Sequence, residues 1–410
     1  MRFGVFYELQ LPRPWNDGDE RLMFHEALAQ VALADRLGYD YAWEVEHHFL
    51  DEYSHSSAPE VFLAATAART TRIRLGHGIK QVIPNYNHPA RTAECLSTLD
   101  IISNGRVDFG FGEGATRLEL GGFKIPAKEK RAMAIEAARE IANMMALTPY
   151  PGFEGKYFSM PCRNVLPKPV QRPHPPMWMA CTNRDTIKIA ASLGVGALAF
   201  SFVDPDEARR WAEIYYGIIK SDACVPIGRA VNANIAMVSS FSVHADRGEA
   251  IRRGHEGFEF FGYALNALVA RDTRPGRTNL WGEYLALRGD RTQAVIDAVD
   301  GVSARASGIG TPDDMRLHLR AFQDAGIDQV IFMQQAGRNR HDHICESLEL
   351  FAGEVMGEFS TAAADREAKK ADELAPFIEA ALARKVWMQP LRDEEIPVVA
   401  ASVAKAQINS

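Results

Sequence analysis

The chain has 410 residues, with 46 Lys+Arg against 53 Asp+Glu and a formal net charge of −7 at pH 7. A chain of this length buries a hydrophobic core without disulfides or metal ions. The mildly acidic balance argues against a protein that binds the nucleic-acid backbone through a basic face, so nucleic acid is not expected as a partner. The 21 Phe, 11 Tyr and 6 Trp argue against extended disorder.

Several local features favour a cytoplasmic protein. The segment from Met1 to Tyr7 lacks the charged start and long apolar run of a signal peptide. Nowhere do 18 uncharged apolar residues follow one another, so we expect no membrane partner. The five cysteines lie far apart and form no CxxC pair, which is typical of reduced thiols rather than of a disulfide framework or a zinc site. We expect no bound metal.

Short β-prone runs alternate with amphipathic helical patterns along the chain. The predicted strands are 2–7, 41–45, 73–79, 107–111, 177–180, 197–200, 232–241 and 329–333. The predicted helices are 19–37, 59–69, 89–103, 128–147, 185–193, 206–220, 311–325 and 341–359. Eight strands, each separated from the next by a helix, imply parallel pairing. We therefore predict an α/β fold, a (β/α)8 TIM barrel over residues 1–359.

Three segments depart from this repeat. Residues 149–176 are rich in proline and are predicted to be irregular. Residues 246–308 form an insertion after the seventh strand, and its aromatic residues suit either a lid or substrate wall, or a helical hairpin with a small core of its own. Residues 360–410 form a C-terminal extension, with an exposed helix to about Lys385. Its last, more apolar part is expected to dock on its own barrel or on a second subunit.

The residues that follow each strand are the candidates for chemistry, because a TIM barrel builds its active site at the C-terminal ends of its strands. Glu46-His47-His48-Phe49 follows the second strand. A histidine in this position suits acid–base or hydrogen-bonding work near neutral pH, and we take His47 as the catalytic candidate. For His48 a functional and a structural role stay open, because neighbouring side chains of an extended segment point apart.

A glycine-rich run follows the fourth strand. Residues 110–115 match the dinucleotide fingerprint G-x-G-x-x-A, but no capped amphipathic helix directly follows and no acidic strand end lies about 20 residues on. We favour the interpretation that these glycines let a loop or a flat ligand approach the barrel mouth. A nicotinamide dehydrogenase is kept as an alternative.

A second candidate site for a ligand precedes the helix at 185–193. Cys181, Thr182 and Asn183 lead into this helix, where unpaired backbone N–H groups and the helix dipole favour an anion such as phosphate. Arg184 adds a positive charge. Ordinary N-capping by Thr182 or Asn183 explains the same residues equally well.

Taken together, several segments resemble the bacterial-luciferase-like family of flavin-dependent monooxygenases, on its aldehyde- and ketone-oxidising side. The resemblance extends from residue 1 to about 355 and is carried by residues 1–6, 46–49, 88–91, 99–100, 103–110, 310–314 and 325–328. It implies a TIM barrel that binds reduced FMN from a separate NAD(P)H:flavin reductase, forms a C4a-peroxyflavin with O2 and oxygenates a small apolar aldehyde or ketone. It also implies a homodimer.

The resemblance assigns roles by position. His47 matches the histidine that is important for the peroxyflavin chemistry, and Glu46 precedes it. Gly78 and Ile79 fall where the family often has a non-proline cis peptide beneath the flavin ring. Gly112 stands where luciferase has a reactive cysteine.

The phosphate contacts are also assigned by position. Glu113 stands where an arginine helps to hold the phosphate of FMN. Asn183 and Thr186 fall on phosphate-contacting positions, with Arg184 as a substitute charge.

Two alternatives of other kinds remain. One is an oxidoreductase of the same superfamily that uses the deazaflavin F420 and transfers a hydride without oxygen. It needs a pocket for the long anionic tail of F420, and no Lys/Arg cluster in the sequence indicates such a pocket. The other is a flavin-binding protein without turnover, against which the intact Glu46-His47-His48-Phe49 segment and the full set of eight units argue.

Overall fold

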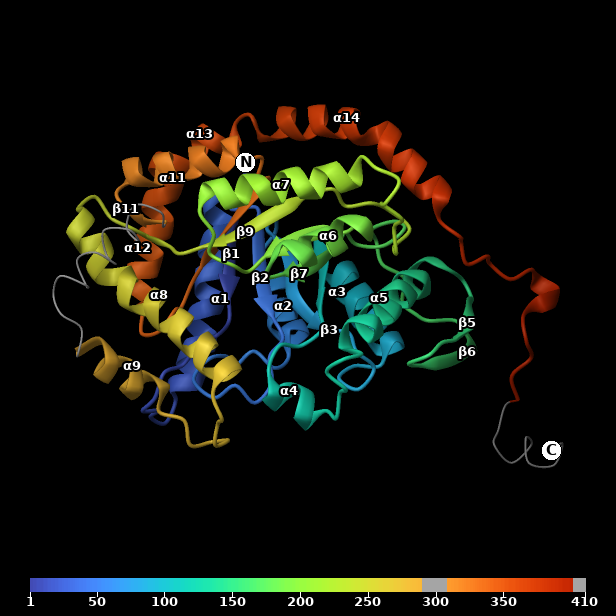
Figure 1. Ribbon diagram of the computed structural model, residues 1–410, viewed down its shortest axis with the longest axis horizontal. Coiled ribbons are helices and arrows are strands. Elements are labelled where there is room, and N and C mark those ends of the chain that lie inside the picture. Colours follow the sequence, from blue (N-terminus) through green and yellow to red (C-terminus); the bar gives the residue numbers. More distant parts are fainter. Residues whose placement is uncertain (290–307, 401–410) are drawn as a thin grey trace.

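The structure, a computed structural model, describes residues 1–289 and 308–400 (Figure 1). Eight parallel strands form a closed barrel in the order β1-β12-β9-β8-β7-β4-β3-β2. The barrel prediction is confirmed. The strands are β1 Arg2–Tyr7, β2 Tyr41–Val45, β3 Arg74–Gln81, β4 Val107–Gly112, β7 Met177–Cys181, β8 Gly196–Ala199, β9 Ile235–Ser239 and β12 Gln329–Met333.

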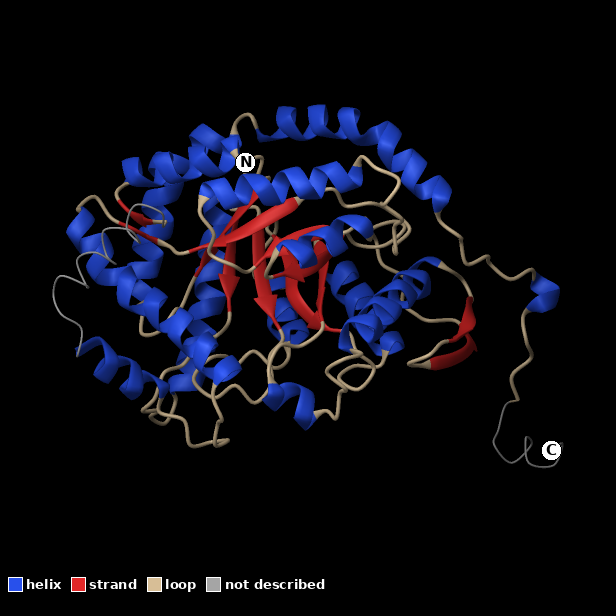
Figure 2. Ribbon diagram, in the orientation of Figure 1, coloured by secondary structure: helices blue, strands red, loops and turns tan. Residues whose placement is uncertain are grey.

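Helices surround the strands and separate them along the chain (Figure 2). These helices are α1 Asp19–Leu37, α2 Pro59–Ala67, α3 Pro89–Ile102, α5 Lys130–Ala146, α6 Arg184–Ser192, α7 Pro205–Ile219, α11 Pro312–Asp324 and α12 His341–Phe351. Prolines occupy the first turns of α2, α3, α7 and α11, where a missing backbone N–H costs no intrahelical bond. The helices pack on the outside of the barrel through one large apolar cluster.

The inside of the barrel is filled by a second apolar cluster. Phe6, Trp43, Trp178 and Leu198 belong to it, and the Trp43 and Trp178 rings meet edge to face with centroids 5.5 Å apart. The same cluster continues into the insertion, through aromatic residues such as Phe261. The insertion is therefore packed against the mouth of the barrel rather than around a separate core.

The insertion begins and ends at one place. Its described helices are α8 Arg247–Ala270 and α9 Leu280–Gly289. The short strands β10 Ser242–Val243 and β11 Ile309–Gly310 pair in parallel and bring its two ends together. Most of 247–289 is thus helical, as in the helical-hairpin alternative but without a separate core, whereas residues 290–307 of the predicted insertion lie outside the described residues.

Two predictions about local structure were wrong. Residues 149–176 are not wholly irregular, because β5 Tyr150–Glu154 and β6 Ser159–Arg163 pair as an antiparallel hairpin. A short helix, α4 Arg117–Gly122, directly follows the glycine-rich run, with a capping box between Thr116 and Glu119. Gly110 and Gly112 belong to β4, and a Cβ on Gly110 would lie 2.1 Å from the carbonyl oxygen of His77. They let β4 approach β3 where that strand bulges.

The C-terminal extension lies on its own barrel at the end opposite the active-site loops (Figure 1). After the π-helical turn Ala352–Met356 and α13 Gly357–Ser360, helix α14 Ala363–Arg384 crosses the N-terminal ends of the strands. Lys370 donates to Asp328 at 2.6 Å, and Arg2 pairs with Glu367 at 2.6 Å. The extension thus closes the bottom of the barrel, and its helix is docked rather than free.

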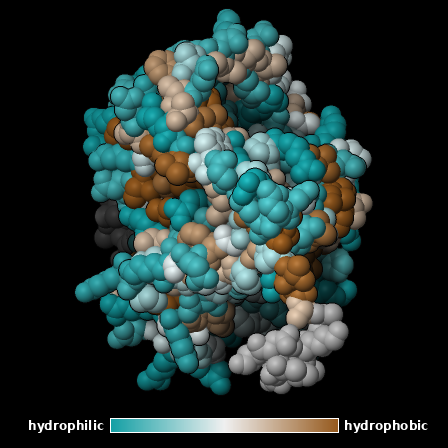
Figure 3. Space-filling model, turned by 90° about the vertical axis from the view of Figure 1, so that its right-hand side faces the viewer, coloured by the Kyte–Doolittle hydropathy of each residue, from teal (hydrophilic) through white to brown (hydrophobic). Residues whose placement is uncertain are grey.

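The remainder of the tail extends away from the body of the protein, on the right-hand side of the view (Figure 1). Arg229 donates to the backbone oxygen of Met388 at 2.6 Å, which is a contact with its own barrel domain. Beyond the short 3-10 turn Asp393–Glu395, Val398 is 99% exposed. The face on this side is largely hydrophilic with scattered apolar patches (Figure 3).

Candidate active site

A cavity of about 380 Å³ opens at the C-terminal ends of the strands, as the barrel predicts. Its wall is mostly apolar and comes from seven strands or the loops after them, closed on one side by α8. The apolar lining residues include Phe6, Leu50, Ile79, Phe111, Met179, Phe200, Phe202, Val238, Phe261, Leu265 and Leu268. A wall of this kind excludes water and suits a flat aromatic ligand together with an apolar one.

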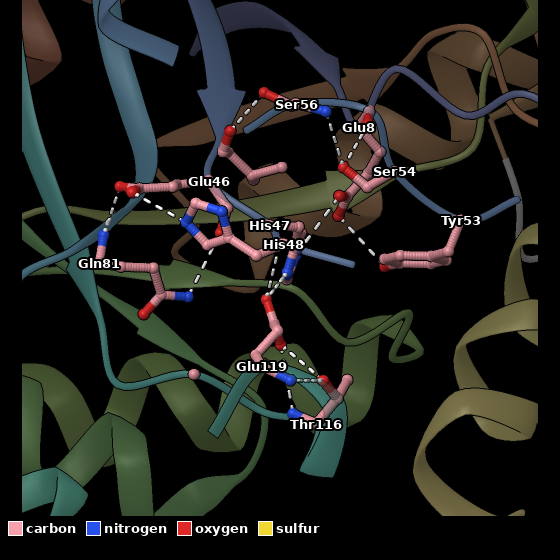
Figure 4. A network of polar contacts seen from close by, with 12 residues as sticks. Glu8, Glu46, His47, His48, Tyr53, Ser54, Ser56, Gln81, Thr116 and Glu119 are labelled. Carbon is pink, nitrogen blue, oxygen red and sulfur yellow. Dashed lines mark hydrogen bonds and ion pairs between the residues drawn. The ribbon is translucent and has the colours of Figure 1, made fainter. Parts of the chain in front are cut away.

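One polar cluster interrupts this wall, and it is centred on His47 (Figure 4). The Nδ1 atom of His47 lies 2.9 Å from Oε1 of Glu119, and its Nε2 atom lies 3.5 Å from Oε2 of Glu8. The hydroxyl of Tyr53 donates to Oε1 of Glu8 at 3.1 Å. We call Glu8, His47 and Glu119 the Glu–His–Glu cluster. All three are buried, with exposed fractions of 4%, 7% and 0%.

Two carboxylates set the charge of the imidazole. Burial by itself lowers the pKa of His47, but the facing carboxylates of Glu8 and Glu119 outweigh it and raise this pKa to about 9. Burial raises the pKa of Glu119, yet the His47 charge and hydrogen bonds from His47, Thr116 and the His48 backbone bring it down to about 2. At neutral pH the cluster therefore holds an imidazolium beside an ionised Glu119.

His48 points away from the cavity. Its ring stacks on Tyr86 with centroids 5.7 Å apart, and its Nε2 atom lies 3.2 Å from Oε1 of Glu46. Glu46 does not line the cavity either, since it is held by the Lys80 ammonium at 3.0 Å and the Gln81 backbone at 2.9 Å. Glu46 and His48 thus support the loop that carries His47.

At the other end of the cavity lies a polar group that we call the phosphate end: Lys130, Arg131, Thr182, Asn183 and Thr186. Asn183 and Thr186 form a capping box at the start of α6. The backbone N–H groups of Thr182 and Asn183 already donate to Oγ1 of Thr186, at 3.0 and 3.1 Å. These two N–H groups are therefore already paired, and Asn183 is the N-cap of α6, as the N-capping alternative expects.

The positive charge of the phosphate end comes from α5 and not from the predicted arginine. Arg131 makes two hydrogen bonds of 3.0 Å to Glu113, and Lys130 lies 3.5 Å from the same carboxylate. Two cations against one carboxylate leave a net positive charge beside the cavity. Arg184 instead pairs with Glu207 through two short hydrogen bonds, is about half exposed and does not line the cavity.

The remaining predicted residues divide between the wall and its support. Ile79 and Gly112 line the cavity together with Glu113. Gly78 and Cys181 lie outside the lining, and the Cys181 thiol donates to the backbone oxygen of Met179. In the described chain the cis peptide bonds precede Pro14, Pro149, Pro167 and Pro173. The expected cis bond between Gly78 and Ile79 is therefore a trans bond, in a strand that bulges there.

Sequence reasoning missed four residues of the site: Glu8, Gln81 and Arg131, which line the cavity, and Glu119, which holds His47 from outside the lining. Glu119 has a local signature, because Thr116-Arg117-Leu118-Glu119 is a capping-box pattern. The other three come from a strand end or a helix start with no motif around them. Only the closed barrel brings them to one cavity.

Two further findings concern the described part of the chain. Within residues 1–289 and 308–400, no three or more His, Cys, Asp or Glu side chains are grouped to hold a metal ion. In the same ranges no helix is both long and apolar enough to cross a bilayer.

Comparison with known proteins decides the family. The model of the luciferase-like monooxygenases matches residues 1–329. The chain belongs to this family. The oxygenase component of the flavin-dependent trigonelline monooxygenase of Acinetobacter baylyi is 24% identical over 380 residues, which is 89% of this chain and 98% of that protein. The crystal structure of monooxygenase RslO1 from Streptomyces bottropensis is similar with a TM-score of 0.71 and 26% identity, over 88% of this chain and 100% of that one.

Proteins with another cofactor also match. The solved structure of the coenzyme F420-dependent tetrahydromethanopterin reductase from Methanopyrus kandleri is similar with a TM-score of 0.61 and 20% identity, over 88% of this chain and 99% of that one. The 5,10-methylenetetrahydromethanopterin reductase of Methanopyrus kandleri is 26% identical over 346 residues, 80% of this chain and 93% of that protein. Some alignments are shorter: that with the uncharacterized protein y4wF of Sinorhizobium fredii is 30% identical over 197 residues, 47% of this chain and about half (54%) of that protein. The chain is thus a luciferase-like oxidoreductase whose relatives use more than one flavin-type cofactor.

Proposed function

We propose that the protein is the oxygenase of a two-component system, which uses reduced FMN and O2 to oxygenate a small apolar aldehyde or ketone, by a Baeyer–Villiger reaction where the substrate is a ketone. One observation carries the proposal. The mostly apolar cavity holds a buried imidazolium, His47, at one end and a net positive phosphate end at the other. A reduced flavin and an apolar carbonyl compound need these three properties together.

The residues present fit a flavin. Oε1 of Gln81 is buried in the cavity wall and has no hydrogen-bond partner among the described residues, so it is free to accept a ring N–H. Apolar side chains such as Ile79 and Phe111 line the cavity and offer surfaces for a flat ring. Thr182, Asn183 and Arg131 would hold the phosphate. When bound, reduced FMN supplies the two electrons with which one atom of O2 enters the product and the other leaves as water.

The chain's own residues supply exclusion of water and a proton. Phe261, Leu265 and Leu268 of α8 cover the cavity and keep water from a reactive oxygen species. His47 holds a proton at Nε2, the ring nitrogen turned toward Glu8 and the cavity, and can donate a hydrogen bond there. Proton transfer by a positioned side chain accelerates such reactions by roughly 10²–10⁴-fold.

Two partners follow from this function. A separate NAD(P)H:flavin reductase would supply reduced FMN, which the name of the Acinetobacter relative as an oxygenase component supports. A homodimer formed through α2 and α3 is supported by the exposed apolar side chains Val61, Ile101 and Ile102 on these helices. We expect the protein and the reductase to be found together in the cytoplasm.

The second candidate is an F420-dependent oxidoreductase that transfers a hydride, favoured by the match to the Methanopyrus reductase and by the likeness to a solved reductase structure that is named as F420-dependent. Anaerobic titration with reduced FMN and with reduced F420 separates the two, with quenching of intrinsic tryptophan fluorescence as the readout. We expect reduced FMN to bind in a 1:1 ratio and more tightly than F420. Tighter binding of F420 would overturn the assignment of FMN in favour of the second candidate.

Because the phosphate end holds both cations and a carboxylate, removing one or the other is expected to change the affinity for FMN in opposite directions. Replacing Arg131→Met removes a charge-assisted hydrogen bond to the phosphate and is expected to weaken FMN binding by roughly ten- to a hundredfold. Replacing Glu113→Gln removes the competing carboxylate and is expected to strengthen it. Isothermal titration calorimetry measures both. Riboflavin, which has no phosphate, is the control: equal effects on FMN and riboflavin would contradict this placement of the phosphate.

A further inference from the structure

Glu8 directly follows β1 and turns one oxygen toward the cavity. Its Oε1 atom accepts the hydrogen bond from Tyr53, whereas its buried Oε2 atom has no hydrogen-bond partner in the described residues. This Oε2 atom lies 3.5 Å from Nε2 of His47, whose other nitrogen is bound to Glu119. Each of the two side chains therefore keeps one polar atom for a ligand, and the two atoms are side by side.

The surroundings of Glu8 favour its protonated form. His47, Tyr53, Glu119 and Glu44 are the titratable groups that face it, and among them His47 is the cation. Burial raises the pKa of Glu8 to about 7, against the opposing effect of His47. Because Tyr53 donates to Oε1, the proton is placed on Oε2. In mildly acidic solution Oε2 of Glu8 carries this proton, while the ionised Glu119 still faces the His47 imidazolium, so both Oε2 of Glu8 and Nε2 of His47 are donors.

We propose that Glu8 is a catalytic proton donor which, together with His47, forms an oxyanion site for the carbonyl oxygen of the substrate. This inference rests on the proposed function, because that function places a carbonyl group at this end of the cavity. Two donors aimed at one point stabilise the negative charge that develops on a carbonyl oxygen under attack. A single acceptor oxygen fits between donors 3.5 Å apart, and an alkane or alkene offers no such atom.

The proton balance of the step is simple. When the oxygen nucleophile derived from O2 and reduced FMN adds to the carbonyl carbon, the C=O π pair moves to the carbonyl oxygen. That oxygen takes the proton from Oε2 of Glu8. When the neighbouring carbon–carbon bond migrates to the added oxygen, the O–O bond of the nucleophile breaks and its second oxygen leaves with the bonding pair, to end as water. The carbonyl re-forms, and the proton returns to the Glu8 carboxylate. Glu8 is unchanged over the cycle, and the two electrons come from reduced FMN.

The test uses the protein without flavin, so its result does not depend on whether the flavin-loaded protein is an active oxygenase. NMR of protein labelled with 13C at the glutamate carboxyl carbons follows each carboxyl through pH, and the Glu8 signal is identified by its loss in Glu8→Gln. We expect this signal to titrate near pH 7. In Tyr53→Phe, a second variant that keeps Glu8, the midpoint is expected to rise because a hydrogen bond that favours the carboxylate is gone. A Glu8 midpoint near that of ordinary glutamates would overturn the proposal.

A matched pair of probes tests recognition of the carbonyl group in the same samples. Cyclohexanone accepts hydrogen bonds, and methylenecyclohexane has nearly the same shape without the oxygen. We expect saturating cyclohexanone to raise the Glu8 midpoint, because it stabilises the protonated form, and methylenecyclohexane to leave it in place. No shift with cyclohexanone, or equal shifts with both probes, would overturn the donor role.

The loaded enzyme gives a second readout. Turnover of a ketone is expected to fall as the pH rises through 7, where Glu8 loses its proton. Glu8→Gln keeps an N–H donor but cannot titrate, so its profile is expected to lose this fall. The same fall in the variant would contradict the assignment.

Discussion

Replacing His47→Ala is expected to lower turnover by roughly 10²–10⁴-fold, while the affinity for reduced FMN changes little. The imidazolium is the cavity's buried proton donor between Glu8 and Glu119, so its loss removes the hydrogen bond to the reacting oxygen. The phosphate end, at the far side of the cavity, is untouched. Steady-state turnover of an aldehyde or ketone found by screening, together with anaerobic flavin titration, measures the two effects separately.

The neighbouring histidine provides a matched control. The His48 ring is stacked on Tyr86 outside the cavity, so His48→Ala is expected to leave turnover within a few-fold of the wild-type value. Equal losses in both variants would show that the loop as a whole matters, and not the imidazole of His47. Unchanged turnover in His47→Ala would contradict the catalytic assignment outright.

Replacing Trp43→Ala is expected to lower the free energy of unfolding by roughly 3–5 kcal/mol. Trp43 is 1% exposed inside the barrel, stacks on Tyr41 and meets Trp178 edge to face. Removing the indole ring leaves an empty space inside the barrel, and a closed sheet cannot contract to fill it. Because the same apolar cluster reaches Phe6 and Val238 in the cavity wall, flavin binding is expected to weaken as well.

Denaturation in urea measures this loss as a lower midpoint with an unchanged slope. The control is Leu317→Ala on α11, where the leucine is 67% exposed and the replacement is expected to change stability by no more than about 0.5 kcal/mol. A loss for Trp43→Ala as small as that of the control would contradict the interior core described above.

The fold was predictable because its strands carry strong local signals. Buried parallel strands such as β12 are short apolar runs between amphipathic helices, so their number and order along the chain follow from periodicity. The β5–β6 hairpin was missed because prolines such as Pro161 mask the strand pattern of a short, exposed pair. The bounds of β3 were also set by tertiary structure, since the strand runs past its bulge to Gln81.

The site was predictable only in part. His47 has a position and a motif that mark it, whereas Glu8 and Arg131 are ordinary acidic and basic residues in the sequence. The role of Glu8 comes from its burial and from neighbours far away along the chain, such as Glu119, 111 residues later. The role of Arg131 comes from the place of α5 at the cavity. The assignment of phosphate charge to Arg184 was wrong for the same reason, because its partner Glu207 belongs to the next helix, α7.

The measurement that tests the central claim most directly is rapid mixing of the protein, loaded with photoreduced FMN, with buffer that contains 18O2 and an aldehyde or ketone substrate. Absorbance follows the flavin, and mass spectrometry then determines the 18O content of the oxygenated product. The account predicts a slowly decaying absorbance transient, distinct from reduced and oxidised FMN, and exactly one 18O atom in each product molecule. Immediate reoxidation of the flavin with no transient and no 18O in any product would contradict an oxygenase.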